Sequence, residues 1–276
     1  MDEAAVLEIK HLTKMFHSVA ALDDVSLLAL PAAIHVLLGE DGAGKTTLLK
    51  VLGGLIPASA YEGEILVEGQ PVSIRTPLDS FRHGMAVVPR GLGVFPSMSV
   101  LDNIMVGHRP GDRSLLSGSR AARQRAEQAL RRAGLNLALD VNVDRLSTAQ
   151  QRQLMLVRAL STGPRLIVLD EPSAFSSGPG ELGQLMRTLR DLAGQNLALL
   201  YLTRVPEEAM QIGDRITILR DGALVGSYER ADFDLTTLVM AMRSQHPERS
   251  PGPEDGEEPD GLLGSLRSIF GFGKRS

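Results

Sequence analysis

Short runs of apolar residues recur along this chain, without the alternation of apolar and polar positions that marks a half-buried strand. The runs span residues 33–38, 165–169, 197–202 and 215–219. Strands that are apolar at every position are typical of a parallel sheet covered on both faces. Between the runs, the pattern predicts a helix over about 45–53 and a polar, Arg- and Ala-rich helix over 118–134 that stops at a glycine. The pattern therefore favours an α/β fold.

The composition excludes several classes of site. The chain has no Cys, so it holds no disulfide, thiol nucleophile or Cys-ligated zinc. Its 6 His are scattered without the spacing of metal ligands. With no Trp, 4% aromatic residues and a net charge of −4, it lacks the stacking platforms and the basic field of a nucleic-acid-binding protein. A length of 276 residues allows one large domain or two small ones.

The sequence shows no sign of membrane insertion or export. No apolar run approaches the roughly 20 residues that a helix needs to cross a bilayer. The N-terminus opens Met1-Asp2-Glu3 and lacks the basic-then-apolar pattern of a signal peptide. We therefore expect a cytoplasmic chain, whose contact with a membrane would come through a partner or a surface.

Charge is unevenly distributed near the C-terminus. Residues 246–261 are rich in Pro, Gly and acids, and the part from 247 to 261 has a net charge of −5. Such a stretch buries too little apolar surface to fold, so we expect an acidic disordered linker after a folded body that ends near residue 245. Residues 262–276 carry a net charge of +3 and have apolar residues at helical spacing. We interpret them as a basic amphipathic tail that contacts a membrane or partner or, because of its glycines, as a disordered end.

A phosphate-binding loop follows the first apolar run. Its pattern, G-x-x-x-x-G-K-[ST], comprises Gly39, Glu40, Asp41, Gly42, Ala43, Gly44, Lys45 and Thr46, with Thr47 beside it. Glycines in such a loop allow the tight turn that presents backbone N–H groups to phosphate oxygens, and the next helix directs its positive end to the same place. Lys45 would neutralise the β- and γ-phosphates, and the Thr46 hydroxyl would ligate Mg²⁺. The alternative is an ordinary Gly-rich turn between a strand and a helix.

Two carboxylates, Asp170 and Glu171, end another apolar run. Acids at the end of a buried strand are costly unless they meet a cation or water. After a phosphate-binding loop, Asp170 is suited to the Mg²⁺ shell and Glu171 to polarising the water that attacks a phosphoryl group. Without that loop, the same residues would indicate only a capped strand end.

A third segment lies between these two and comprises Leu146, Ser147, Thr148, Ala149 and Gln150. Ser147 and Gln150 form an S-x-x-Q capping box, which predicts the start of a helix. Free N–H groups and a serine hydroxyl at a helix N-terminus can bind an anion. The alternative interpretation is an ordinary capped helix.

With the phosphate-binding loop and the LDEP sequence at 169–172, this segment resembles the signature of ABC-type ATPases. The resemblance covers most of residues 5–243, and its details look most like the ATPase subunits of bacterial sugar importers. It is carried by ALDDVSL at 21–27, GEDGAGKTTLLKVLGG at 39–54, SVLDNIMVG at 99–107, QRQLMLVRAL at 151–160 and DRITILRDG at 214–222. A P-loop kinase would leave the LSTAQ segment unexplained.

The resemblance implies a P-loop NTPase fold of the ABC type over residues 1–245. A RecA-like core with a β-subdomain would occupy about 1–75 and 163–245, and an inserted helical subdomain about 76–162. Two such domains, identical or different, would pair head to tail, with each ATP between one phosphate-binding loop and the other domain's signature. Phe16 matches the aromatic residue that stacks on adenine. ATP and Mg²⁺ are the implied cofactors, permease subunits the implied partners, and the inner face of the cell membrane the implied location.

Four segments depart from this family. The mildest departure is in the signature, where Thr148 and Ala149 occupy places that usually hold glycine. Arg90 stands where the family has its Q-loop glutamine, and no Gln occurs from 71 to 123. Arg204 follows Thr203 where the family has its switch histidine. Residues 174–177 replace the usual D-loop run that ends in aspartate. A guanidinium neither ligates Mg²⁺ nor exchanges protons near neutral pH, although it can bind a phosphate bidentately.

We therefore expect ATP to bind well and hydrolysis in this chain's own site to be slow, with Arg90 and Arg204 at the nucleotide. The retained Glu171 argues against a complete loss of hydrolysis. If both arginines are only surface residues, hydrolysis would be unaffected. The alternative function is an ATP-gated regulatory or docking protein of the same fold with little ATPase activity.

Overall fold

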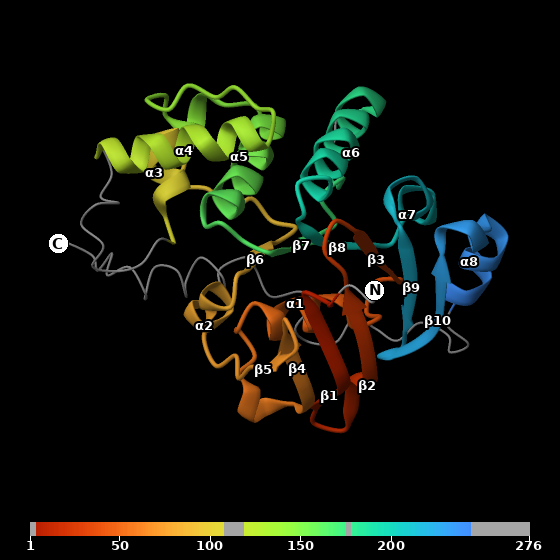
Figure 1. Cartoon of the computed structure of the whole chain (residues 1–276). Helices are drawn as coiled ribbons and strands as arrows, with labels where there is room; N and C mark the ends of the chain where they lie inside the picture. Colours follow the sequence, from red (N-terminus) through yellow and green to blue (C-terminus); the bar gives the residue numbers. More distant parts are fainter. Residues whose placement is uncertain (1–3, 108–118, 175–177, 244–276) are drawn as a thin grey trace.

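The computed structural model describes residues 4–107, 119–174 and 178–243. Within these ranges the chain forms two sheets, and helices pack on both sides of the larger one (Figure 1). The predicted acidic linker, the basic tail and D-loop residues 175–177 lie outside the described residues.

The smaller sheet is antiparallel and contains the first two strands of the chain. Its strands are β1 (Leu7–Phe16), β2 (Val19–Ala29), β4 (Glu62–Val67) and β5 (Gln70–Pro71), in the order β2-β1-β4-β5. Buried and exposed residues alternate from Val25 to Ala29, so one face of this sheet joins the core and the other faces solvent.

The larger sheet is parallel apart from one edge strand. Its strands are β3 (Ile34–Leu38), β6 (Met85–Val88), β7 (Leu166–Asp170), β8 (Ala198–Thr203), β9 (Arg215–Arg220) and β10 (Ala223–Glu229), in the order β10-β9-β3-β8-β7-β6. Strand β10 runs antiparallel, in a hairpin with β9. Strands β3, β7 and β8 are buried at every position, which confirms the parallel sheet predicted from their continuous apolar sequences.

Eight α-helices occur in the described residues. They are α1 (Lys45–Leu52), α2 (Pro77–Arg82), α3 (Val100–Met105), α4 (Arg120–Arg132), α5 (Thr148–Ser161), α6 (Pro179–Ala193), α7 (Pro206–Ile212) and α8 (Leu235–Met242). Short 3₁₀ turns cover Ala58–Ala60, Val143–Arg145 and Arg230–Asp232. Across this part of the chain, no helix is both long and apolar enough to cross a bilayer.

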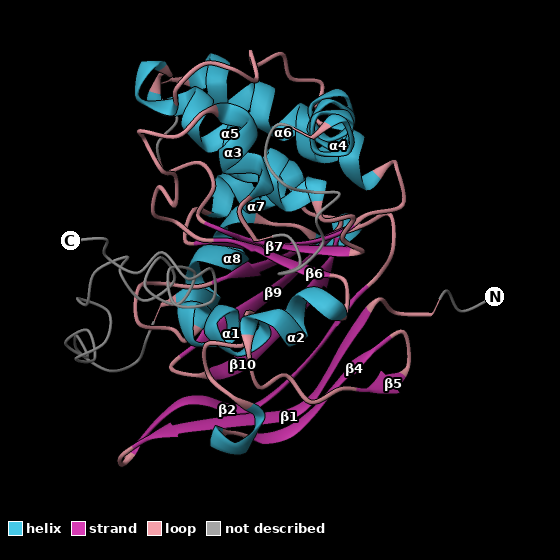
Figure 2. Ribbon diagram, turned by 90° about the vertical axis from the view of Figure 1, so that its left-hand side faces the viewer, coloured by secondary structure: helices cyan, strands magenta, loops and turns pink. Residues whose placement is uncertain are grey.

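Alternate residues of the central strands enter two separate cores. Val36 and Leu38 of β3 belong to the same cluster as buried residues of α5 and α6. Leu37, between them, belongs instead to a cluster with α1 and the antiparallel sheet. Figure 2 shows the resulting layers, with the antiparallel sheet and α1 on one side of the larger sheet and α3 to α6 on the other.

Helices α3, α4 and α5 pack against one another on that second side. Arg158 links α5 to α3 and to the loop before it, because its guanidinium donates to the carbonyl oxygens of Asn103 in α3 and of Gly93 at 2.7 and 2.5 Å. The helical subdomain expected over about 76–162 also contains β6, which pairs with β7 in the larger sheet. We therefore place the start of the helical part after Val88.

His35 of β3 ties the two sheets together. Its side chain is buried, with Nδ1 2.5 Å from the carbonyl oxygen of Leu28 in β2 and Nε2 2.8 Å from the hydroxyl of Thr217 in β9. A neutral ring fits these partners, with Nδ1–H donating to Leu28 and Nε2 accepting from Thr217. Burial lowers the pKa of His35 to about 4, so the ring stays neutral at physiological pH.

We expect His35 to make the fold less stable in mild acid. Its pKa is about 4 in the folded chain and about 6.5 in an unfolded one. Between these values only the unfolded state binds the proton, so the free energy of unfolding should fall as the pH drops through this window. The loss should be about 2 kcal/mol at about pH 5 and on the order of 3 kcal/mol at about pH 4, measured by urea unfolding.

His35→Gln removes the titrating ring and should flatten this pH dependence. His17→Asn, at an exposed position, is the matched control and should leave it intact. The assignment would be contradicted by a His35→Gln variant whose unfolding free energy responds to pH as strongly as that of the parent chain.

Candidate nucleotide-binding site

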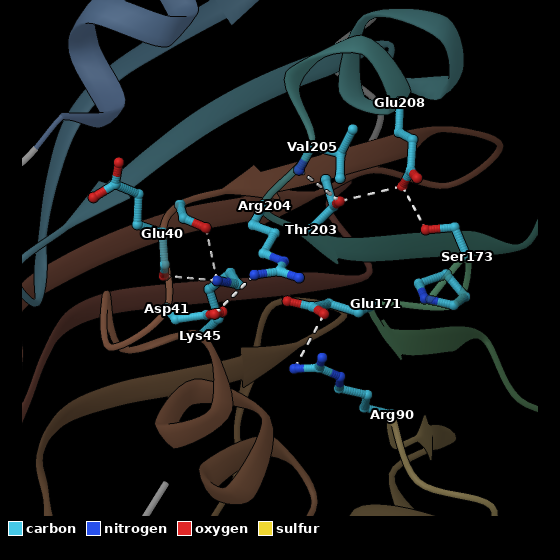
Figure 3. A network of polar contacts seen from close by, with 12 residues as sticks. Glu40, Asp41, Lys45, Arg90, Glu171, Ser173, Thr203, Arg204, Val205 and Glu208 are labelled. Carbon is cyan, nitrogen blue, oxygen red and sulfur yellow. Dashed lines mark hydrogen bonds and ion pairs between the residues drawn. The ribbon is translucent and has the colours of Figure 1, made fainter. Parts of the chain in front are cut away.

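Four segments meet at the carboxyl edge of the larger sheet. Strands β3, β8, β7 and β6 are parallel neighbours, so their carboxyl ends lie along one edge in that order. These ends lead into the phosphate-binding loop, Arg204, Glu171 and Arg90. Figure 3 shows the side chains of Lys45, Arg204, Glu171 and Arg90 gathered there. Ligands of α/β sheets bind at such an edge.

Two glycines of the loop are required by close backbone contacts. Gly44 has a φ of 108°, and a Cβ on it would lie 2.4 Å from the carbonyl oxygen of Ala21 in β2. A Cβ on Gly39 would lie 2.4 Å from the carbonyl oxygen of Leu219 in β9. A side chain at either position would displace backbone, so the loop is seated directly on these two strands.

Lys45 begins α1, and its ammonium lies inside the loop. The side chain is buried and donates to the carbonyl oxygens of Gly39 at 2.7 Å and Glu40 at 2.9 Å. Burial lowers the pKa of Lys45, and the charges of Glu171 and Asp41 oppose that shift. Two carbonyl oxygens therefore hold the ammonium inside the loop at the start of a helix, a place where a positive charge can meet a phosphate.

Asp170 and Glu171 are adjacent buried acids. Burial and the neighbouring charge of Glu171 raise the pKa of Asp170 to about 6, against the opposing charges of Lys45 and Arg90. A divalent cation would relieve this repulsion, and Asp170 with the exposed Thr46 hydroxyl supplies the oxygen ligands that Mg²⁺ prefers. The described residues contain no cluster of three acids or histidines that could hold a metal ion.

Glu171 adopts an uncommon backbone conformation just after β7. Its φ of 41° lies in the left-handed region, which costs a non-glycine residue on the order of 1 kcal/mol. Two backbone hydrogen bonds hold this turn: the Glu171 N–H donates to Leu202 at 2.9 Å, and the Glu171 carbonyl accepts from the Ala174 N–H at 3.0 Å. The turn leaves the carboxylate between Arg90 and Arg204 (Figure 3).

Arg90 binds both acids. Its Nη1 lies 3.3 Å from Glu171 Oε2, and its positive charge and backbone N–H both act to lower the pKa of Asp170, against the larger effect of burial. Arg152 of α5 in turn donates to the carbonyl oxygens of Arg90 at 2.5 Å and of Pro172 at 3.3 Å. The residue at the Q-loop position is therefore a cation that neutralises Glu171.

Arg204 pairs with the phosphate-binding loop. Its Nη1 lies 3.0 Å from Asp41 Oδ2, and both side chains are at least half exposed. An exposed ion pair contributes only about 0–1 kcal/mol to stability. Arg204 is therefore close to the phosphate position and held weakly enough to exchange partners.

Glu208 of α7 is a buried carboxylate that the sequence pattern does not single out. It accepts hydrogen bonds from the hydroxyls of Ser173 and Thr203, which Figure 3 shows, and from the hydroxyl of Tyr201. Glu207 and Glu208 stand in the first turn of a helix, where acids are common because they complement the helix dipole. Their sequence position therefore carries no signal of this role.

The capping box predicted for Ser147 and Gln150 is confirmed at the start of α5. The Ser147 hydroxyl accepts from the Gln150 N–H at 3.2 Å, and the Gln150 side-chain oxygen accepts from the Ser147 N–H at 3.0 Å. Thr148 and Ala149 are helical without a positive φ, so side chains there introduce no backbone strain. Leu146 is half-buried, whereas Ser147 and Thr148 are exposed. Across the described residues, no hydrogen bond joins this segment to the chain's own phosphate-binding loop.

Phe16 lies at the end of β1 and is half-buried. The ammonium of Lys14 lies 4.4 Å from the centroid of its ring, a cation–π contact. Stacking of adenine on Phe16 stays a prediction, and the geometry adds Lys14 as a cation against the same ring.

The chain matches the family model described as ABC transporter over residues 22–174. It is 40% identical over 240 residues to the ribose import ATP-binding protein RbsA 1 of Burkholderia cenocepacia. It is 34% identical over 258 residues to the ribose import ATP-binding protein RbsA of Hahella chejuensis. These alignments cover 86% and 92% of this chain but 46% and 51% of the relatives, so the chain spans about half their length.

Solved structures share the fold. A nucleotide-free ATP-binding cassette from an ABC transporter aligns with a TM-score of 0.69 at 23% identity, over 82% of this chain and 91% of that one. MJ1267, an ATP-binding cassette of an ABC transporter, aligns with a TM-score of 0.72 at 23% identity, over 87% and 99%. The expected ABC-type P-loop fold is thereby confirmed. Because the family model matches more than half of the chain and spans the phosphate-binding loop, the signature segment and both acids, the chain belongs to the ABC transporter family.

Proposed function

We propose that this chain is the ATP-binding subunit of an ABC-type importer for a sugar. The observation that carries the proposal is the meeting of Lys45 with the Asp170–Glu171 pair at one edge of the sheet. A cation inside a loop of N–H groups, beside two buried acids, is what binding and hydrolysis of a nucleoside triphosphate require. The import role and the sugar are supported by the names of the relatives, which are ribose import ATP-binding proteins.

In this proposal the loop from Gly39 to Thr46 cradles the triphosphate of ATP, and Phe16 stacks on adenine. Lys45 neutralises the β- and γ-phosphates from inside the loop. Thr46 and Asp170 would hold Mg²⁺, which supplies positive charge to the same phosphates.

Hydrolysis requires a group that accepts a proton from water as its oxygen attacks the γ-phosphorus and the bond to the β-phosphate oxygen breaks. Glu171 is placed for this role. The Arg90 Nη1 lies 3.3 Å from one carboxylate oxygen of Glu171, which is almost fully buried, whereas the Arg90 side chain is half exposed. The carboxylate oxygen beside Arg90 is not free to meet the attacking water, so we infer that hydrolysis at this site is slow.

We also propose that a second cassette and membrane-spanning permease subunits complete the system at the inner face of the membrane. The exposed Ser147 at the start of α5 offers N–H groups and a hydroxyl to a phosphate outside the chain's own loop. The relatives are about twice as long as the aligned part of this chain, which fits a system that needs a second half.

Lys45→Met should weaken ATP binding by about 10- to 100-fold, because hydrogen bonds to charged groups contribute about 1.5–3 kcal/mol each. Titration with a fluorescent ATP analogue measures the loss. Lys10→Met, at a surface ion pair with Glu8 on β1, is the control and should bind like the parent. Equal affinity of Lys45→Met and the parent would contradict the proposed site.

Arg90→Gln should raise steady-state ATP turnover by several-fold, because it frees the Glu171 carboxylate from its cation. Phosphate release, with Mg²⁺ present, is the measurement. Arg187→Gln, at an exposed position on α6, is the control and should not change turnover.

Glu171→Gln should abolish turnover in both the parent and the Arg90→Gln background. Unchanged or lower turnover in Arg90→Gln would contradict the inhibitory role of Arg90. If the parent and Arg90→Gln both bind ATP but turn it over no faster than Glu171→Gln, the regulatory alternative is favoured.

A further inference from the structure

Glu208 lies in α7, outside the segments proposed to contact the nucleotide. One of its carboxylate oxygens accepts hydrogen bonds from three hydroxyl groups. Oε2 accepts from Ser173 Oγ at 2.7 Å, from the Tyr201 hydroxyl at 3.0 Å and from Thr203 Oγ1 at 3.2 Å. Thr203 Oγ1 in turn accepts from the Val205 N–H at 3.1 Å. The carboxylate is therefore the shared acceptor of a small buried network (Figure 3).

This carboxylate depends on the hydroxyls. It is 9% exposed, and in the described part of the chain no Lys or Arg forms an ion pair with it. A buried carboxylate without a counter-ion is costly unless hydrogen bonds solvate it. Burial and the Glu208 charge raise the pKa of Tyr201, so its hydroxyl keeps the proton that it donates. Moving any of these donors away would leave charge unsolvated, so the network resists separation.

Two of the three donors, Ser173 and Thr203, lie at the carboxyl ends of neighbouring strands, next to Glu171 and Arg204. Ser173 follows Glu171 by two residues, in the loop after β7. Thr203 ends β8 and directly precedes Arg204, whose guanidinium reaches Asp41 in the phosphate-binding loop. The Oε2 atom of Glu208 in α7 therefore connects the loop that contains Glu171 with the end of β8 that precedes Arg204. Arg204 in turn bonds Asp41, so the connection extends to the phosphate-binding loop.

We propose that Glu208 is a positioning residue, which holds the loop of Glu171 and the strand end of Arg204 at a fixed separation across the position of the γ-phosphate. The proposal rests on the proposed function, because it assigns Glu208 a role in ATP hydrolysis. It does not make Glu208 a contact of the nucleotide. Its removal therefore affects the chemical step rather than the binding of ATP, since small misplacements of reacting groups slow catalysis strongly.

The test compares three full-length variants with the parent. Glu208→Leu keeps the approximate size but removes both acceptor oxygens. Glu208→Gln keeps one acceptor oxygen and is the conservative rescue. Glu207→Leu, on the same helix but exposed, is the matched control.

The first measurement is amide hydrogen exchange of segments 171–174 and 203–205, without nucleotide. Glu208→Leu should lose protection by about tenfold or more in both segments, Glu208→Gln should lie between it and the parent, and Glu207→Leu should match the parent. Ser173→Ala should loosen the first segment alone and Thr203→Val the second alone. These two milder variants decide the question if Glu208→Leu does not fold.

The second measurement is ATP turnover. Glu208→Leu should lower kcat by about tenfold while KM for ATP stays within about twofold. The proposal is overturned if both segments keep their protection in Glu208→Leu, if Glu207→Leu has the same effect, or if KM rises in proportion to the loss of kcat. A parent chain that does not bind ATP would instead refute the proposed function, and the exchange measurement would still decide whether Glu208 joins the two segments.

Discussion

The parallel register of four strands is the constraint on which the site depends. Backbone hydrogen bonds between β3, β8, β7 and β6 bring their carboxyl ends to one edge, although these strands are separated by long stretches of sequence. A register shift by one residue would turn every side chain of a strand to the opposite face. It would therefore exchange the side chains that enter the two buried cores and move Asp170 away from Lys45. The continuous burial of β3, β7 and β8 favours a single register. That register determines which side chains lie together at the carboxyl edge of the sheet.

The charges at this edge are balanced in the folded chain. Asp41, Asp170 and Glu171 face Lys45, Arg90 and Arg204, and two of the cations form direct ion pairs with acids. ATP bound at the proposed site would bring several negative charges of its own and would compete with the acids for the same arginines. The exposed pair between Arg204 and Asp41 is the easier one to exchange, because water screens it, whereas Arg90 is bound to a buried carboxylate. The two arginines therefore respond differently to a phosphate, although each replaces a neutral or titratable residue of the family.

Much of this site follows from local sequence. Apolar runs predict β3, β7 and β8, and the capping box of Ser147 and Gln150 forms as its spacing predicts, because both depend on neighbours along the chain. The partners of Arg90 and Arg204 are not predictable in this way. Glu171 and Asp41 lie 81 and 163 residues away from them, so side-chain geometry across the fold decides the pairing. Glu208 and Arg152 are missed for the same reason, and the extent of the helical part is misjudged because β6 joins the core sheet from within it.

The close contact between the phosphate-binding loop and β2 limits how the loop can move relative to the antiparallel sheet. Gly44 approaches the backbone of Ala21 so closely that no side chain fits between them, and the strand that contains Ala21 forms a hairpin with the strand that ends at Phe16. The same hairpin therefore carries Phe16 and the seat of the phosphate-binding loop, so the fold fixes the distance between the proposed adenine contact and the proposed phosphate site. Helices α3 to α5 are joined to the larger sheet through two connections, 89–99 and 162–165. Any displacement of these helices would reach the site through those two connections, which lead directly to Arg90 and to strand β7, and it would leave the hairpin that carries Phe16 unchanged.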